Sequence, residues 1–256
     1  MTREKTTKIN RLLESSPHGA VLTTTWLKNQ GISEKLAWWY VQSGWLKHLA
    51  DGAYYFAAFP VRWVGAVNAV QQQLNLPVHI AAKTALQLAG KSHYVPMRLN
   101  TIQLFGTPQT KLPRWTQTST WNESFILFCP KLFNKPVDNA LIKIEVDGLS
   151  LTVSAPERAA LELCYLVPQK ATFEETALIL ESLSRMRSKL LQALLESCTS
   201  YKAKRLLLYL GDHFGHPWMS ELDLSKIDLG KGKRVIAGGG CYNARFQVSV
   251  PELGDN

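Results

Sequence analysis

The side chains of this sequence that could support metal or thiol chemistry are scattered along the chain. Its cysteines lie more than thirty residues apart, so no CxxC pair or small disulfide framework is present; they are Cys129, Cys164, Cys198 and Cys241. His213 and His216 have a spacing that zinc ligands use, but Pro217 follows directly and no second ligand pair accompanies them. We therefore expect buried, unreactive thiols and no metal site.

Two glycine-rich segments invite comparison with phosphate-binding loops. Residues 230–233 are Gly-Lys-Gly-Lys and residues 238–240 are all glycine, but neither matches GxxxxGK[ST] or joins a strand to a helix. Glu145 and Asp147 alternate on one strand face, yet Asp147 is also the first residue of an Asp-Gly turn. No serine, histidine and acid motif is present either, so we expect neither an enzyme nor a cofactor.

Length and composition indicate a globular protein of two domains. The chain has 256 residues, of which 46% are hydrophobic and 19% charged, which suits packed cores. No apolar stretch approaches the roughly 20 residues that cross a bilayer, and no apolar segment follows the basic N-terminus as it would in a signal peptide. We expect a cytoplasmic protein with no membrane partner.

Positive charge is distributed unevenly along the chain. The formal net charge is +9, and no carboxylate occurs between Asp51 and Glu123. The cations in that interval are Arg62, Lys83, Lys91, Arg98, Lys111 and Arg114. A polyanion would meet no local repulsion there, which favours phosphate binding, although so sparse a set of cations would also form an ordinary solvated surface.

The first part of the chain has the pattern of a helix-turn-helix. Apolar spacing predicts a helix over residues 3–15 and a short second helix that stops before Gly31, a residue suited to a tight turn. Ser33 is placed to cap a third helix that ends near Ser43. The side chains expected on its buried face are Leu36, Trp39 and Tyr40. Two short helices across a glycine turn form this motif.

The opposite face of the third helix has the residue types that contact DNA. Lysine suits phosphate oxygens, glutamine suits base edges and an indole suits apolar contact in a groove. The candidate DNA-binding residues are Ser33, Glu34, Lys35, Trp38 and Gln42. The alternative for single residues is that Trp38 packs on a neighbouring element and Lys35 is merely solvated.

A hairpin follows the third helix. Strand-like residues flank Asp51-Gly52, a dipeptide typical of a two-residue turn, so the whole unit is predicted to be a winged helix-turn-helix. Lys47 and His48 near the wing tip could reach phosphates, although His48 also suits an ordinary surface position.

Two further helices, over 62–74 and 80–89, complete a predicted DNA-binding domain of residues 1–92. Arg62 and Lys83 join the candidate DNA contacts. The small residues around Lys83 also fit a packed helix from which a lysine extends to solvent.

Residues 93–256 are predicted to form a mixed α/β domain. With the winged helix-turn-helix before it, the whole chain is expected to belong to the α+β class. Strand-like runs at 101–105, 124–129, 141–146 and 149–153 precede helices, and final strands are expected at 234–237 and 245–250. Ser154 with Glu157, and Thr172 with Glu175, have capping-box spacing. We expect those glutamates to cap helices rather than to catalyse.

Two basic clusters in this second domain are candidate partner-binding sites. One opens a helix, where cations oppose the helix dipole and so do not stabilise it: Lys202, Lys204 and Arg205. The other occupies a glycine-rich loop: Lys231, Lys233 and Arg234. Solvated surface charge is the alternative for both.

Several segments resemble one known family. In the first half these are Ser43-Gly-Trp-Leu with Gly52-Ala-Tyr, and Pro77-Val-His-Ile-Ala-Ala-Lys-Thr-Ala-Leu-Gln-Leu-Ala-Gly. In the second half they are Pro156-Glu-Arg-Ala-Ala-Leu-Glu-Leu, Lys202-Ala-Lys-Arg-Leu and Asp228-Leu-Gly-Lys-Gly-Lys-Arg. Over nearly its whole length the chain resembles the AbiEi antitoxins, the transcriptional-regulator half of bacterial AbiE abortive-infection (type IV toxin-antitoxin) operons.

The resemblance implies an antitoxin that binds double-stranded operator DNA, as a monomer or weak dimer, and represses its own operon. It also implies a cognate nucleotidyltransferase-like toxin, countered with or without direct contact. The chain itself lacks the Gly-Ser loop and clustered carboxylates of such a transferase. The alternative is a winged helix that docks proteins without binding DNA, since this fold does not impose one function.

Overall fold

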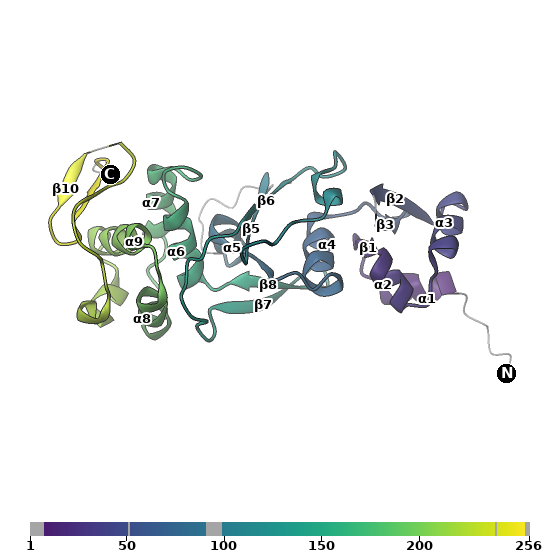
Figure 1. The fold of residues 1–256 in the computed structure, drawn as a ribbon, viewed down its shortest axis with the longest axis horizontal. Helices are drawn as coiled ribbons and strands as arrows, with labels where there is room; N and C mark the ends of the chain where they lie inside the picture. Colours follow the sequence, from purple (N-terminus) through teal and green to yellow (C-terminus); the bar gives the residue numbers. More distant parts are fainter. Residues whose placement is uncertain (1–7, 51, 91–98, 239, 254–256) are drawn as a thin grey trace.

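The computed structural model describes residues 8–50, 52–90, 99–238 and 240–253. The molecule is elongated, with helices α1 to α3 and their hairpin at one end, a five-stranded sheet in the middle, and helices with a small sheet at the other end (Figure 1). The predicted α+β class is confirmed. Asp51, Lys91, Arg98 and the predicted domain boundary between residues 92 and 93 lie outside the described residues.

The N-terminal end is a winged helix-turn-helix. Its elements are α1 (Lys8–Ser15), β1 (Leu22–Thr23), α2 (Thr24–Asn29), α3 (Glu34–Gln42), β2 (Leu46–Ala50) and β3 (Ala53–Phe56). The strands form an antiparallel sheet in the order β1-β3-β2. The unit has its own core, which includes Leu12, Leu22, Leu27, Ile32, Tyr40, Leu46 and Phe56.

The caps of α2 and α3 explain where these helices begin. The hydroxyl oxygen of Thr23 accepts from the backbone N–H of Trp26 at 3.2 Å, and that of Ser33 accepts from Leu36 at 3.3 Å. Gly31, between the helices, has φ +74°, a conformation that favours glycine. The predicted cap at Ser33 and the turn at Gly31 are confirmed.

The next segment leads into a larger sheet. Its elements are α4 (Trp63–Asn68), a π-helical extension η1 (Ala69–Gln73), β4 (Val78–Ile80) and α5 (Ala82–Leu88). β4 was not predicted. From the sequence, no strand was assigned to residues 78 and 79, and residue 80 was placed in the predicted helix over 80–89. It pairs with β5 (Thr101–Gly106) on one side and β8 (Leu149–Ser154) on the other. With β6 (Ser124–Phe128) and β7 (Leu141–Val146), the sheet order is β6-β5-β4-β8-β7.

This sheet unites the two predicted domains. β4 lies in its centre and comes from the first of them, while the other strands come from the second. One core contains Val67 of α4 and Leu86 of α5 together with Leu151 of β8 and Leu161 of the helix that follows it, α6 (Pro156–Leu166). α4 to α5 therefore pack with the sheet. The winged helix has a core of its own, and a further apolar cluster joins its residues Val21, Leu49 and Ala53 to Ala66 and Val70.

A close junction joins the winged helix to the sheet. A Cβ atom at Gly65 would lie 2.0 Å from the backbone oxygen of Gly19, so α4 can approach the N-terminal unit only with glycine there. The Gln73 side chain accepts from the N–H of Thr23 at 2.9 Å and donates to the carbonyl of Val21 at 2.7 Å. These contacts hold the winged helix in one orientation on the sheet.

Helices and a small sheet form the far end of the molecule. The helices are α6 (Pro156–Leu166), α7 (Phe173–Glu181), α8 (Ser188–Ser197), α9 (Tyr201–His213) and the short 3₁₀ segments η3 (Pro217–Glu221) and η4 (Leu224–Lys226). A further 3₁₀ segment, η2 (Arg114–Gln117), lies instead beside β2 and β6. The strands are β9 (Arg234–Val235), β10 (Cys241–Asn243) and β11 (Val248–Val250), ordered β10-β11-β9.

One of the two predicted capping boxes is present in part. The Thr172 hydroxyl accepts from the N–H of Glu175 at 3.1 Å, at the start of α7, but the Glu175 carboxylate pairs with Lys83 rather than with the N-cap. The other prediction is wrong, because Ala155 is the N-cap of α6 and the Ser154 hydroxyl donates to Glu162 instead. Pro156 at the first helical position explains how α6 begins without a side-chain cap.

Candidate nucleic-acid interface

The outward face of α3 is open to solvent. Lys35 and Gln42 are exposed, and the Trp38 side chain is 60% exposed. Trp39 is 53% exposed, which corrects the expectation that it lies in the core. Ala37 and Tyr40 are the fully buried residues of the helix. Residues three apart lie on the same side of a helix, so the buried side runs through Ala37 and Tyr40. Trp38 and Trp39, between them in the sequence, therefore point outward.

The first turn of α3 carries a cap and an ion pair. Ser33 is exposed but its hydroxyl is used as the N-cap. Glu34 pairs with Lys28 of α2 at 2.7 Å, and the hydrogen bond from Lys28 holds the pKa of this carboxyl below its usual value. The one acidic residue on this face is thus neutralised locally, which leaves Lys35 to set the charge of the helix surface.

The wing presents its candidate residues beside α3. Lys47 and His48 of β2 are both exposed, and the His48 ring contacts the edge of Tyr54 with 5.2 Å between ring centroids. Trp45, between α3 and β2, is 44% exposed. Exposed indoles at Trp38, Trp39 and Trp45 thus flank the lysines. The exposure of Trp39 was not predicted from the sequence periodicity. The signal that could have revealed it was Ala37, a small residue that occupies a buried position of the helix.

Two other candidate DNA contacts lie away from this face. Arg62 pairs with Asp147, in the turn between β7 and β8, with 2.7 Å between the charged atoms. Lys83 of α5 forms an ion pair with Glu175 of α7. Both cations are therefore used within the sheet-containing part, and the structure does not bring Lys83 together with α3 (Figure 1). Either cation would have to leave its ion pair before it could contact DNA.

The cluster at the start of α9 has a structural role, which corrects its expected role as a partner site. Arg205 is completely buried and donates to the backbone carbonyls of Leu229, Gly230, Gly232 and Gln247 at 2.6–3.0 Å. Lys202 donates to the carbonyls of Tyr165 and Val167 at the end of α6. These cations stabilise elements other than their own helix, which sequence reasoning about the α9 dipole could not detect.

Burial accounts for the third member of that cluster as well. Lys204 is 2% exposed, and its ammonium lies 5.0 Å from the centroid of the Tyr201 ring. Burial lowers the pKa of both Lys202 and Lys204. A partner protein could not reach Lys204 or Arg205 without local unfolding.

The second basic cluster is accessible. Lys231, Lys233 and Arg234 are exposed, and the Lys233 ammonium lies 4.7 Å from the centroid of the Tyr242 ring. This cluster lies at the end of the molecule opposite the winged helix (Figure 1). It stays a candidate partner-binding surface.

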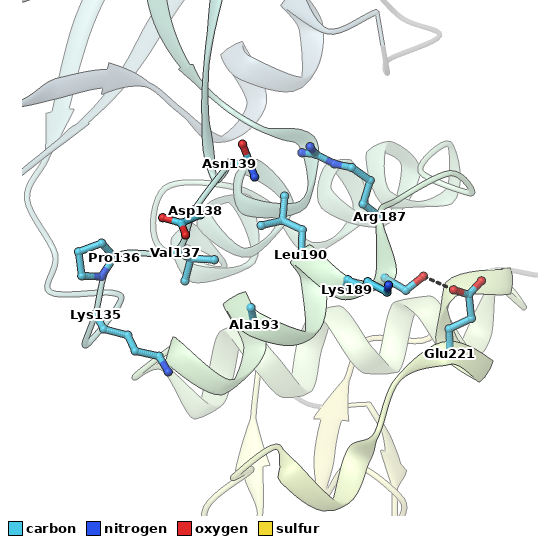
Figure 2. Close-up of a pocket in the computed structure, with 11 residues that line it drawn as sticks. Lys135, Pro136, Val137, Asp138, Asn139, Arg187, Lys189, Leu190, Ala193 and Glu221 are labelled. Carbon is cyan, nitrogen blue, oxygen red and sulfur yellow. Dashed lines mark hydrogen bonds between the residues drawn. The ribbon is translucent and has the colours of Figure 1, made fainter.

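The described residues also contain an open pocket of about 760 Å³ between the 135–139 loop and α8. Figure 2 shows that its lining mixes charges of both signs, with Asp138 and Glu221 near Lys135 and Lys189. Arg187 there is held by Glu157 at 2.9 Å. Burial opposes ionisation of Glu157, but Arg187 outweighs it and lowers the pKa of the carboxyl. Since its charges are balanced or paired, this pocket favours no particular ligand.

Within the described ranges, no group of three or more histidine, cysteine or acidic side chains could hold a metal ion. Cys164 is fully buried, and burial raises the pKa of its thiol far above the usual value. Cys241, in contrast, is exposed, which corrects the expectation that the thiols are buried. In the part of the chain that the structure describes, no helix has the length and apolar character needed to cross a membrane.

The helices α1 to α3, the hairpin and the exposed indole and lysine side chains define a winged-helix protein with a second, α+β part. A family model described as "Transcriptional regulator, AbiEi antitoxin, Type IV TA system" matches residues 99–251, and its N-terminal domain model matches residues 5–97. The chain belongs to this family of AbiEi antitoxin transcriptional regulators. The resemblance noted in the sequence is confirmed.

A solved structure agrees with this assignment at the level of the fold. The crystal structure of the RV2827C protein from Mycobacterium tuberculosis has a TM-score of 0.61 to this chain, with 16% sequence identity. The alignment covers 94% of this chain and 88% of the Mycobacterium tuberculosis chain. At this identity the similarity supports a common fold and nothing finer. No curated protein sequence matches the chain.

Proposed function

We propose that this protein binds operator DNA in its own toxin-antitoxin promoter and represses the operon. The observation that carries the proposal is the solvent-facing surface of α3, where Lys35, Trp38 and Gln42 are exposed together on the second helix of a helix-turn-helix. A helix of this kind enters the major groove with its side chains against base edges. The family assignment to transcriptional regulators supports the same function.

Each candidate residue has a distinct proposed role. Lys35 contacts phosphate, Gln42 hydrogen-bonds a base edge, and Trp38 makes apolar contact in the groove. Ser33 and Glu34 position the start of α3 through the cap and the Lys28 ion pair. Lys47 and His48 of the wing contact phosphates beside the groove, with Arg62 as an outer contact when it is released from Asp147.

The same protein is proposed to act in the cytoplasm as the antitoxin of a nucleotidyltransferase-like toxin. The family description, which names a type IV antitoxin, supports this part of the proposal. The exposed cluster of Lys231, Lys233 and Arg234 is the candidate surface for a partner in that role. Because the cluster lies at the opposite end from the winged helix, DNA binding and toxin neutralisation would use separate surfaces.

A second candidate function is a winged helix that docks another protein. The observation that favours it is the group of exposed indoles at Trp38, Trp39 and Trp45. Tryptophan is enriched in protein interfaces, and an exposed apolar group of this kind often marks one. Salt separates the two functions, because DNA binding through several phosphates weakens steeply as salt rises, whereas apolar docking does not.

The test is a gel shift on the operon's own promoter at about 50 and about 200 mM salt, the range over which phosphate contacts lose affinity. The Lys35→Ala, Gln42→Ala double variant should bind at least about tenfold more weakly, since each base contact contributes about 1–3 kcal/mol. The matched control is Lys143→Ala with Gln169→Ala, both exposed and away from α3. Unchanged affinity in the α3 variant would remove the recognition-helix assignment.

A further inference from the structure

A second pocket lies between β4, the end of β5 and the start of α6. It has a volume of about 450 Å³ and a mostly apolar lining that includes Phe105 and Phe133. Its basic side chains are His79, Lys131 and Arg158. Pockets of about 300–1,000 Å³ hold small molecules rather than folded polymers. The ligand class to consider is therefore a small organic molecule.

Two residues of the lining, His79 and Arg158, bind a buried carboxylate, Glu162, whose hydrogen bonds are complete. Glu162 is 0% exposed, and its Oε1 atom accepts from His79 Nε2 at 3.0 Å and Arg158 Nε at 2.7 Å. Its Oε2 atom accepts from the Ser154 hydroxyl at 2.7 Å and the N–H of Ala82 at 3.1 Å. Both oxygens thus have two donors, and Glu162 needs nothing more from Arg158.

Arg158 has donors left over. Only its Nε atom is used by Glu162, and the two terminal amino groups have no partner among the described residues. The side chain is 18% exposed, and its guanidinium lies 4.7 Å from the centroid of the Phe133 ring. A guanidinium fixed by Glu162 on one edge and by an aromatic face presents its remaining N–H groups in one orientation. This is the geometry with which arginine binds phosphate or carboxylate oxygens.

The charge around the pocket favours an anion. Glu162 neutralises one cation, but Lys131 is exposed at the pocket lining and no acidic side chain lines the pocket among the described residues. Thr107 also lines it, but its hydroxyl lies 3.0 Å from that of Thr110. A ligand with several anionic oxygens and an apolar, planar body would use the cations and the aromatic walls together.

We propose that this pocket binds a phosphate monoester of mononucleotide size. Its phosphate contacts the terminal amino groups of Arg158 and the ammonium of Lys131, and its base lies against the apolar lining that includes Phe105. His79 and Glu162 act as positioning residues for Arg158. The site joins β4, from the segment matched by the N-terminal family model, to α6, from the segment matched by the second. It is separate from the α3 surface proposed to bind DNA.

Isothermal titration calorimetry of the full chain with adenosine monophosphate, adenosine and inorganic phosphate tests the proposal. The monophosphate should bind, adenosine should not bind measurably, and phosphate alone should bind more weakly. Lys131→Ala should weaken monophosphate binding by roughly fivefold to tenfold, about the effect of one lost charge-assisted contact. Lys231→Ala, an exposed control in the loop before β9, should leave it unchanged.

A second variant separates ligand binding from folding. Arg158→Lys keeps a positive charge beside Glu162 but removes the planar fork, so it should lose monophosphate binding while its thermal unfolding remains cooperative. The Lys35→Ala, Gln42→Ala variant should bind the monophosphate like the wild type, since α3 lies outside the pocket. Equal binding of adenosine and its monophosphate, no binding at millimolar monophosphate, or unchanged binding in Lys131→Ala would each overturn the proposal.

Discussion

His79 Nε2 lies 3.0 Å from Glu162 Oε1, and this hydrogen bond joins residues 83 positions apart in the sequence. Because an ionised carboxylate can only accept, the His79 nitrogen carries the proton in this bond. His79 lies on β4 and Glu162 on α6, in the segments matched by the two different family models. The buried pair therefore belongs to a core built from both segments, and its loss should affect unfolding of both.

Replacing the carboxylate should make the protein less stable and less sensitive to acid. Burial alone would raise the pKa of Glu162, but His79 and Arg158 outweigh burial and hold it below its usual value of 4.5. A carboxyl whose pKa is depressed by folding stabilises the protein above its unfolded-state pKa, and that contribution is lost as pH falls through the folded-state pKa. Glu162→Gln should therefore lower the free energy of unfolding near neutral pH by about 3 kcal/mol.

Urea denaturation between neutral and acidic pH measures this effect. The difference between Glu162→Gln and the wild type should shrink as the pH falls below about 4.5. Glu145→Gln, an exposed control on β7, should follow the wild type at each pH. A constant difference across the whole range would contradict an ionised Glu162 in the folded protein.

Removing the buried guanidinium should destabilise the small C-terminal sheet. Arg205→Met leaves the carbonyls of Leu229, Gly230, Gly232 and Gln247 without their donor, which should cost about 3–5 kcal/mol. Hydrogen exchange should show faster opening of β9 and β11. The control Lys231→Ala removes an exposed cation and should change stability by less than about 0.5 kcal/mol. Equal exchange in both variants would argue against the structural role of Arg205.

Trp39 should contribute to binding rather than to stability. Its side chain is 53% exposed, so Trp39→Ala should change the unfolding free energy by less than about 1 kcal/mol. If the proposed function holds, operator affinity should fall about tenfold, equivalent to about 1.4 kcal/mol. Operator binding should also quench less tryptophan fluorescence in this variant.

The matched control is Tyr242→Ala, which removes an aromatic ring 43% exposed at the other end of the molecule. It should bind the operator like the wild type. Should Trp39→Ala retain full operator affinity but lose association with a co-purifying protein, the protein-docking function would replace DNA binding.

A single added methyl group should disturb the junction between the winged helix and the sheet. In Gly65→Ala, the new Cβ atom would lie 2.0 Å from the Gly19 oxygen and 2.9 Å from the Ala20 Cα atom, so the backbone must move. Overpacking of this kind costs about 1–3 kcal/mol. Gln72→Ala, an exposed position in the following η1 segment, is the control for thermal unfolding. A wild-type melting temperature for Gly65→Ala would show that the junction is loosely packed.

Local signals in the sequence predicted much of the winged helix. The Ser33 cap, the Gly31 turn and the hairpin strands depend on residues within a few positions of one another, and all are present. The strands predicted at 101–105 and 141–146 coincide with β5 and β7. Trp39 was misplaced because residues 36–41 of α3 are all apolar, so the spacing alone does not show which neighbouring positions lie at the edge of its buried face.

The sequence by itself determined the class of the fold, the N-caps at Ser33 and Thr172, the turn at Gly31 and the family of this protein, because each is encoded in short segments. Only the tertiary structure decided that β4 is a central strand, that Arg205 supports four carbonyls, and that His79, Arg158 and Glu162 meet. The physical reason is that burial and hydrogen-bond partners depend on contacts between distant segments. Residue spacing within one segment carries no information about which surface will cover it.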